Sequence, residues 1–294
     1  MFSELINRVI SKGNSEDLAK LENSISDFLE SNHYFSVIEP FILGKGKRIR
    51  SILYFLNWNS DNSSLKKYKT AAMIEMIHFA SILHDDVIDN NFSRRNGNSF
   101  LKEQGKRNSI LFGDLLLVKA INELLKIHSD ELLVKNFCMR ECSAMAYGAV
   151  SERMLSDKSS LDDCLKVASL KTGALFKLSC FLGKYLSSGD FDKAKSAAIF
   201  GLCFGTIFQI QNDFDSYKSP IFSESEDFVQ KNITTPILIL RDFFDFDLER
   251  FFNSNQENYE SIKQIIHSAR FRNVTSGILK KLSQIVFSNE IFQV

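Results

Sequence analysis

Proline is scarce in this sequence, with 3 residues in 294. Because proline lacks a backbone N–H and clashes with the preceding helical turn, its scarcity favours long uninterrupted helices. No segment alternates between polar and apolar residues for long enough to predict a sheet. Linkers, low-complexity segments and internal repeats are also missing. The sequence therefore predicts an all-α fold, and we expect a single domain over residues 1–294.

An excess of either charge is missing as well, since Lys plus Arg is 36 and Asp plus Glu is 36. A balanced chain is not typical of proteins that bind nucleic acid or anionic membranes. The most apolar segment, Ser196–Ile210, is interrupted by Gly, Thr and Gln and is shorter than the roughly 20 residues that span a bilayer. Residues 1–13 contain no apolar stretch typical of a signal peptide. We therefore expect a cytoplasmic protein with no nucleic-acid partner and no stable membrane insertion.

The five cysteines do not form a zinc motif, because no second Cys or His pair follows Cys138 and Cys142 at the spacing of such sites. Their number is odd, and all of them lie in apolar, helix-like patterns. We expect buried, reduced thiols, as in cytosolic proteins.

An acidic motif, His84–Asp89, ends a long helix that the apolar pattern predicts over Tyr68–Asp89. Asp85 and Asp89 are four residues apart and therefore lie on one helical face, about one turn apart. His78 falls on the same stripe. Clustered carboxylates are unfavourable unless they are neutralised, which Mg²⁺ does with oxygen ligands that it shares with phosphate groups. The alternative, a solvated acidic helix end, fits poorly with so apolar a helix.

Two basic clusters flank the predicted helix: the basic loop Gly44–Arg50 before it and Arg94-Arg95 after it. Glycine lets backbone approach a phosphate closely, and Lys and Arg form charge-assisted hydrogen bonds with phosphate oxygens. A lone basic cluster is usually a solvated surface. Two of them around an acidic motif predict clamps for two diphosphates, with Mg²⁺ neutralising the one that departs. The stretch Asn90–Arg107, which includes Arg94-Arg95, is polar, Gly-containing and basic, and is expected to be an active-site loop.

These segments resemble those of trans-isoprenyl diphosphate synthases, the polyprenyl synthetase family. The matching segments follow the family order within residues 40–240: Gly46–Arg50, Ile77-His78, Ala80-Ser81, His84–Asp89, Arg94-Arg95, Gly113-Asp114, Lys171–Phe176 and Phe208–Ile210. The resemblance implies the isoprenoid synthase fold, a bundle of about ten helices around a deep central cavity, usually as a homodimer. It also implies a Mg²⁺-dependent prenyltransferase that condenses isopentenyl diphosphate with an allylic diphosphate, giving a trans-polyprenyl diphosphate and free diphosphate.

The resemblance also assigns roles to single residues. The diphosphate of isopentenyl diphosphate would be held by Lys47, Arg50, His78 and Arg95. The allylic diphosphate would be contacted by Arg94, Lys171 and Thr172. Asp85 and Asp89 would bind Mg²⁺, and Gln209 would lie near the reacting carbons. Catalysis would thus depend on Asp85, Asp89, Arg94, Lys171 and Gln209.

The second metal motif of the family, Asp-Asp-x-x-Asp, is altered here to Asn212-Asp213-Phe214-Asp215-Ser216. Asp213 is the third expected acidic ligand, and Asn212 and Ser216 offer weaker, neutral oxygens on one face. Asp215 does not compensate, because it points about 200° away from Asp213 on a helix. We expect a weakened or water-rich second metal site.

The altered motif keeps two alternatives open. The chain could be a weakly active or regulatory subunit of a heteromeric prenyl synthase. It could also be a class I terpene cyclase, whose metal motif is similar but whose final Glu would fall at Pro220. A cyclase has no need of the clamp formed by Lys47, Arg50 and Arg95.

Product length should depend on the residues one turn below Asp85. Ala80 and Ser81 are both small and occupy that level. We therefore expect an open cavity there and a product longer than farnesyl diphosphate.

Overall fold

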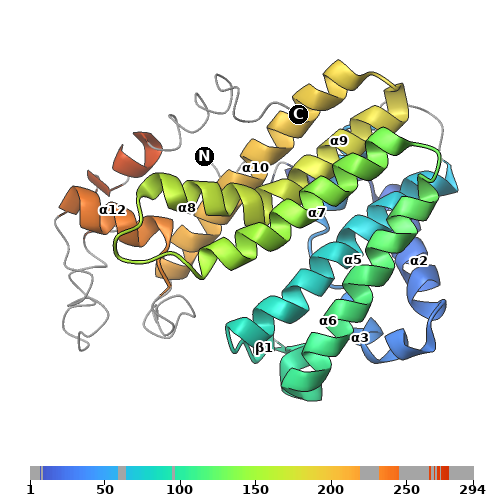
Figure 1. Cartoon of the computed structure of the whole chain (residues 1–294), viewed down its shortest axis with the longest axis horizontal. Coiled ribbons are helices and arrows are strands. Elements are labelled where there is room, and N and C mark those ends of the chain that lie inside the picture. Colours follow the sequence, from blue (N-terminus) through green and yellow to red (C-terminus); the bar gives the residue numbers. More distant parts are fainter. Residues whose placement is uncertain are drawn as a thin grey trace. The chain divides into compact units, whose positions relative to one another are not determined.

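The computed structural model describes residues 7, 9–58, 64–94, 97–218, 232–244, 265, 268, 270–271 and 273–277, with only the backbone for 216–218. These residues are almost entirely helical, which confirms the predicted all-α class. The elements, shown in Figure 1, are α2 (Ser15–Glu30), η1 (His33–Val37), α3 (Glu39–Ile42), α4 (Ile49–Leu56), α5 (Leu65–Ile88), α6 (Phe100–Ile127), α7 (Leu132–Glu152), α8 (Leu161–Ala168), η2 (Ser169–Gly173), α9 (Ala174–Ser188), α10 (Phe191–Lys218) and α12 (Thr235–Phe244). Strands β1 (Ser93–Arg94) and β2 (Gly97–Asn98) form a small antiparallel hairpin.

The chain divides into two compact units. The first contains Met1–Glu141 and Leu178–Ala198, and the second contains Cys142–Lys177 and Ile199–Val294. Among the described helices, none combines the length and the apolar character that crossing a bilayer requires. All five cysteines are buried and free, as expected. Burial raises the pKa of the Cys164 thiol to about 12 and that of Cys203 to about 11, so both stay protonated at neutral pH.

Helix α5 is the core element of the first unit. It packs against α6, α2 and α4, and Figure 1 shows α5 and α6 side by side. Every side chain from Thr70 to Ile77 is buried, including the charged Glu75, so this part of α5 is buried on all faces. A helix without a polar face has to be surrounded by other helices, since no side of it can face water without exposing apolar surface. Its C-terminal turn carries the acidic motif.

Helix α2 shows how local sequence sets the helix boundaries. The Asn14 side chain accepts a hydrogen bond of 3.0 Å from the N–H of Glu16, and acids follow in the first turn, where the helix dipole favours them. Leu21, Ile25 and Leu29 recur every four residues and are fully buried.

Residues 90–107 differ from the expected loop. Helix α6 begins at Phe100, because the Ser99 hydroxyl accepts a hydrogen bond of 3.2 Å from the N–H of Lys102 and caps the helix. Residues 102–107 are polar because this turn faces solvent. Gly105 adopts φ 79°, ψ 166° and kinks the helix there.

The second unit has a core around α12. Ile237–Leu240 pack with Ile210 and Phe214 of α10 and with Cys164 of α8. Phe271 lies edge-on to Phe214, with ring centroids 5.7 Å apart. This packing fixes the C-terminal half of α10, where Gln209 and Asp213 lie.

Candidate active site

The acidic motif keeps helical geometry through Asp89. The N–H of Asp89 donates to the carbonyl oxygen of Asp85 at 2.8 Å, and Asp89 is the C-cap of α5. Both side chains are half-buried. The two carboxylates therefore lie one turn apart at the end of one helix, in the geometry that the spacing predicts.

Charge is concentrated unfavourably at this end of α5. Asp85, Asp86 and Asp89 lie at the negative end of the helix dipole, and the last turn contains no basic residue. Repulsion between the carboxylates adds to the effect of the dipole. Such an arrangement favours a bound cation.

Asp86 is neutralised from within the protein. Its side chain is 2% exposed, and its Oδ1 accepts a hydrogen bond of 2.6 Å from Nε of Arg94 on β1. Burial raises the pKa of Asp86 to about 6, against the opposing effect of Arg94. Asp86 thus holds Arg94 beside the acidic motif. This role was not predicted, although Asp86 is the second acid of the motif.

The remaining pair, Asp85 and Asp89, fits Mg²⁺ by donor type. In the described part of the chain, no three His, Cys, Asp or Glu side chains gather closely enough to hold a metal ion by themselves. Mg²⁺ commonly takes one or two carboxylates and completes its shell with waters and substrate phosphates. Two carboxylates on one helical turn suit such a shared shell.

Gly113 and Asp114 of α6 contact the start of the acidic motif. The Nε2 atom of His84 lies 3.1 Å from Oδ1 of Asp114. A Cβ at Gly113 would lie 2.4 Å from the same nitrogen, so a larger residue there would require the His84 side chain to move.

The basic loop turns through residues with positive φ: Gly44 at 63°, Gly46 at 93° and Arg48 at 48°. Lys47 is exposed, whereas Arg50 at the start of α4 is half-buried. Burial lowers the pKa of Arg50 to about 10, with the negative charge of Glu75 opposing the shift, so Arg50 remains a cation at neutral pH.

In the second unit, three predicted residues form one hydrogen-bonded chain. The Thr172 hydroxyl donates to Oε1 of Gln209 at 2.8 Å, and Nε2 of Gln209 donates to Oδ1 of Asp213 at 2.8 Å. These two bonds fix the orientation of the Gln209 amide, because its oxygen accepts on one side and its nitrogen donates on the other.

Lys171 and Thr172 lie on the π-helical turn η2, which stands between α8 and α9. Such turns insert one extra residue and are frequent at functional sites. Helix α7 contacts this turn directly, since a Cβ at Gly148 would lie 2.3 Å from the backbone nitrogen of Lys171. One turn further along α7, Glu152 accepts a hydrogen bond of 2.6 Å from Nζ of Lys171.

Residues 32–269 match the family model described as polyprenyl synthetase. The chain belongs to the polyprenyl synthetase family. The geranylfarnesyl diphosphate synthase of Methanosarcina mazei is 29% identical over 217 residues, which are 73% of this chain and 72% of that protein. This relative supports the resemblance that the motifs indicated.

Solved structures of the family confirm the isoprenoid synthase fold. A decaprenyl diphosphate synthase from Rhodobacter capsulatus aligns with a TM-score of 0.81 at 21% identity, covering 96% of this chain and 91% of that one. A polyprenyl synthase from Caulobacter crescentus, complexed with calcium and isoprenyl diphosphate, aligns with a TM-score of 0.74 at 23% identity, covering 96% and 88%.

The altered second motif, Asn212–Ser216, is partly described. Asp213 is half-buried and bonded to Gln209, whereas Asp215 is exposed and accepts a hydrogen bond of 2.8 Å from Gln211. The two acids therefore point apart, as predicted. Asn212 is exposed. The side chain of Ser216 and the whole of Arg95 and Pro220 lie outside the described residues.

Glu152 is the second site residue that was not predicted, because nothing in its surroundings along the chain marks it as part of the site. It lies four residues after Gly148, on the α7 face that contacts Lys171, and this contact becomes visible only in the structure.

Proposed function

We propose that this chain is a Mg²⁺-dependent prenyltransferase that condenses isopentenyl diphosphate with an allylic diphosphate, giving a trans-polyprenyl diphosphate and free diphosphate. The observation that carries the proposal is the pair Asp85 and Asp89 on one turn at the end of α5, in a chain of the polyprenyl synthetase family. The relatives named above carry out, by their names, the synthesis of such products.

The acidic motif is the proposed site of diphosphate departure. Asp85 and Asp89 would hold Mg²⁺, which would stabilise negative charge on the leaving diphosphate. The Caulobacter crescentus polyprenyl synthase, solved in complex with calcium, supports a hard divalent cation, because Ca²⁺ and Mg²⁺ share a preference for oxygen ligands. Arg94, aligned by Asp86, donates to the same diphosphate.

Lys171 and Thr172 are the proposed contacts of the allylic diphosphate in the second unit. The hydrogen bond to Glu152 holds the Lys171 ammonium group in place and uses one of its three N–H donors. Gln209 is the proposed neighbour of the reacting carbons, and its amide is held in one orientation by Thr172 and Asp213. Asp213, with Asn212 and Ser216 as weaker ligands, is the proposed second metal site.

Lys47, Arg50, His78 and Arg95 are the proposed clamp for isopentenyl diphosphate. The exposed Lys47 in a glycine-containing loop supports this role. A clamp for a second diphosphate is the feature that separates a condensing enzyme from a cyclase.

The whole chain is proposed to act as one domain and as a cytoplasmic homodimer. Exposed apolar side chains on α6 support the dimer: Leu111 and Val118 are 58% and 66% exposed and lie seven residues apart on one face.

Below the acidic motif, Ala80 is fully buried and Ser81 donates to the carbonyl oxygen of His78. Their small size supports a product longer than farnesyl diphosphate.

The decisive experiment gives the purified chain Mg²⁺, isopentenyl diphosphate and a series of allylic primers, and identifies the products by mass. We expect chain elongation with release of diphosphate. If no primer is elongated until a partner chain is added, the chain is a subunit of a heteromeric synthase. If an allylic diphosphate is consumed without isopentenyl diphosphate, the chain is a cyclase.

A further inference from the structure

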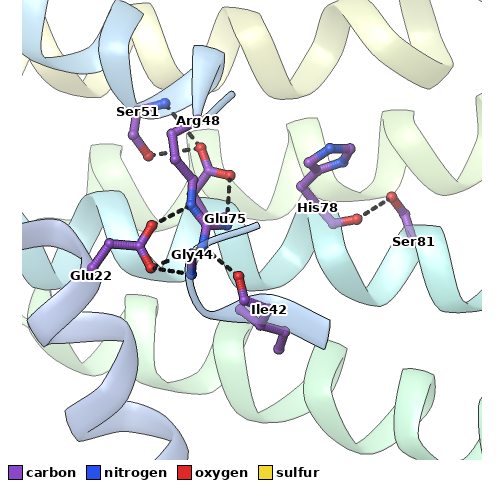
Figure 2. A network of polar contacts seen from close by, with 8 residues as sticks. All are labelled: Glu22, Ile42, Gly44, Arg48, Ser51, Glu75, His78 and Ser81. Atoms are coloured by element: carbon purple, nitrogen blue, oxygen red, sulfur yellow. Dashed lines mark hydrogen bonds and ion pairs between the residues drawn. The ribbon is translucent and has the colours of Figure 1, made fainter. Parts of the chain in front are cut away.

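Arg48, in the middle of the basic loop, is turned into the protein. Its Nε donates to Oε1 of Glu22 at 2.7 Å, and its Nη2 donates to Oε2 of Glu22 at 3.1 Å and to the carbonyl oxygen of Ile42 at 2.7 Å. Its Nη1 lies 3.7 Å from Oε2 of Glu75 (Figure 2). The Arg48 side chain is only 9% exposed. Arg48 is therefore occupied by structural contacts.

Glu75 of α5 caps the N-terminus of α4. Arg48 is the N-cap residue, and its side chain makes no capping hydrogen bond. Instead, Oε1 of Glu75 accepts from the backbone N–H of Ser51 at 3.1 Å and from the Ser51 hydroxyl at 2.8 Å. A carboxylate is favoured at this end of a helix by the unpaired N–H groups and by the dipole. Glu75 thus joins α4 to α5 by buried hydrogen bonds.

Glu22 of α2 closes the basic loop. Its Oε2 accepts from Nη2 of Arg48 and also from the backbone N–H of Gly44 at 3.3 Å. One carboxylate thus holds both ends of the turn that contains Gly46 and Lys47 (Figure 2). Because glycines leave a chain conformationally free, a loop with two of them needs such external contacts to keep one shape.

The contacts also fix the basic loop relative to the helix that carries the acidic motif. His78 lies three residues after Glu75, on the same side of α5. Fixing Arg48 and Ser51 against Glu75 therefore sets the distance from Lys47 and Arg50 to His78. These three residues form the described part of the proposed clamp for isopentenyl diphosphate.

We propose that Glu22 and Glu75 are positioning residues for that clamp: through Arg48 and Ser51 they hold Lys47 and Arg50 in a preorganised geometry. This proposal rests on the proposed function of the chain. Neither glutamate touches substrate. Because a preformed clamp avoids ordering cost on binding, loosening it weakens binding of isopentenyl diphosphate and leaves the allylic substrate unaffected.

The test measures steady-state kinetics of Glu22→Gln and Glu75→Gln, with Glu30→Gln as the matched control. Glu30 is an exposed glutamate on α2, outside the network. Glutamine keeps the size and an acceptor oxygen but loses the charge that pairs with Arg48. Each network variant should raise the KM for isopentenyl diphosphate about tenfold, because the free energy of one lost charged hydrogen bond corresponds to about a tenfold loss of affinity. The KM for the allylic diphosphate and kcat should stay within about twofold, as for independent sites.

Hydrogen exchange of residues 44–51, measured without substrates, reports the same contacts directly. The amides of this segment should exchange faster in both network variants and at the wild-type rate in Glu30→Gln. If Glu75→Gln does not fold, Ser51→Ala removes only the hydroxyl contact and should raise the same KM in the same direction.

The possible failures are distinct. A wild-type chain that elongates no primer refutes the proposed function. An active wild-type chain whose network variants keep their KM for isopentenyl diphosphate, or lose affinity for both substrates equally, refutes the positioning role.

Discussion

At the scale of single residues, Asp85 and Asp89 are proposed to bind Mg²⁺, and both lie at the C-terminal end of α5, where the helix dipole disfavours negative charge. Replacing either by Asn removes a charge from the negative end of α5. We expect turnover to fall by at least about a hundredfold, the usual cost of losing one group that stabilises transition-state charge. The same variants should be more stable than wild type, by about 0.3–1 kcal/mol, because the helix dipole no longer opposes the charge.

The measurements are product formation at saturating substrates and unfolding by urea without Mg²⁺. Asp130→Asn, which changes an exposed aspartate outside the helices, is the control and should alter neither. Full turnover in both the Asp85→Asn and Asp89→Asn variants would remove the basis of the proposed mechanism.

Asp86 should give the stability of the protein a dependence on pH. Its pKa in the folded protein is about 6, compared with 3.8 for an ordinary aspartate, so the folded state binds more protons between these values. The contribution of Asp86 to stability therefore grows as pH falls through 6 and is lost as pH rises through 6. Relative to Asp86→Asn, the wild type should gain about 1 kcal/mol from about pH 7 to pH 5. Urea unfolding of both proteins at the two pH values checks this, and an unchanged difference would contradict it.

At the scale of elements, the contact between α7 and η2 determines where Lys171 lies. Gly148→Ala places a Cβ 2.3 Å from the backbone nitrogen of Lys171, so one of the two elements has to move. Overpacking of this kind costs about 1–3 kcal/mol. We expect the KM for the allylic diphosphate to rise about tenfold, since about 1.4 kcal/mol of lost binding has that effect. Ser143→Ala, at an exposed position of the same helix, should leave that KM unchanged.

The same elements show how far sequence reasoning reaches. The boundaries of helix α2 are of the kind that sequence can indicate, because its cap and its apolar stripe are local signals. The start of α6 was missed, because an exposed helical turn with a glycine has the composition of a loop. The π-turn η2 could not be predicted, since one inserted residue hardly alters the apolar pattern. Within the site, Gln209 and Asp213 could be paired from their spacing, whereas Asp86–Arg94 and Lys171–Glu152 depend on how separate elements pack.

At the scale of the whole molecule, the exposed surface of α6 bears on whether two copies of the chain form a dimer. Leu111 and Val118 are exposed on one helical face, and exposed apolar faces of this kind commonly mark subunit contacts. Replacing both by Glu would place two charges in a dehydrated interface, a change that costs several kcal/mol where the charges stay unpaired. We expect sedimentation to show a dimer for the wild type and a monomer for the double variant. Lys119→Glu, next to Val118 and also exposed, is the control for added negative charge and should remain dimeric. A wild type that sediments as a monomer, or a double variant that stays dimeric, would contradict the proposed homodimer through α6.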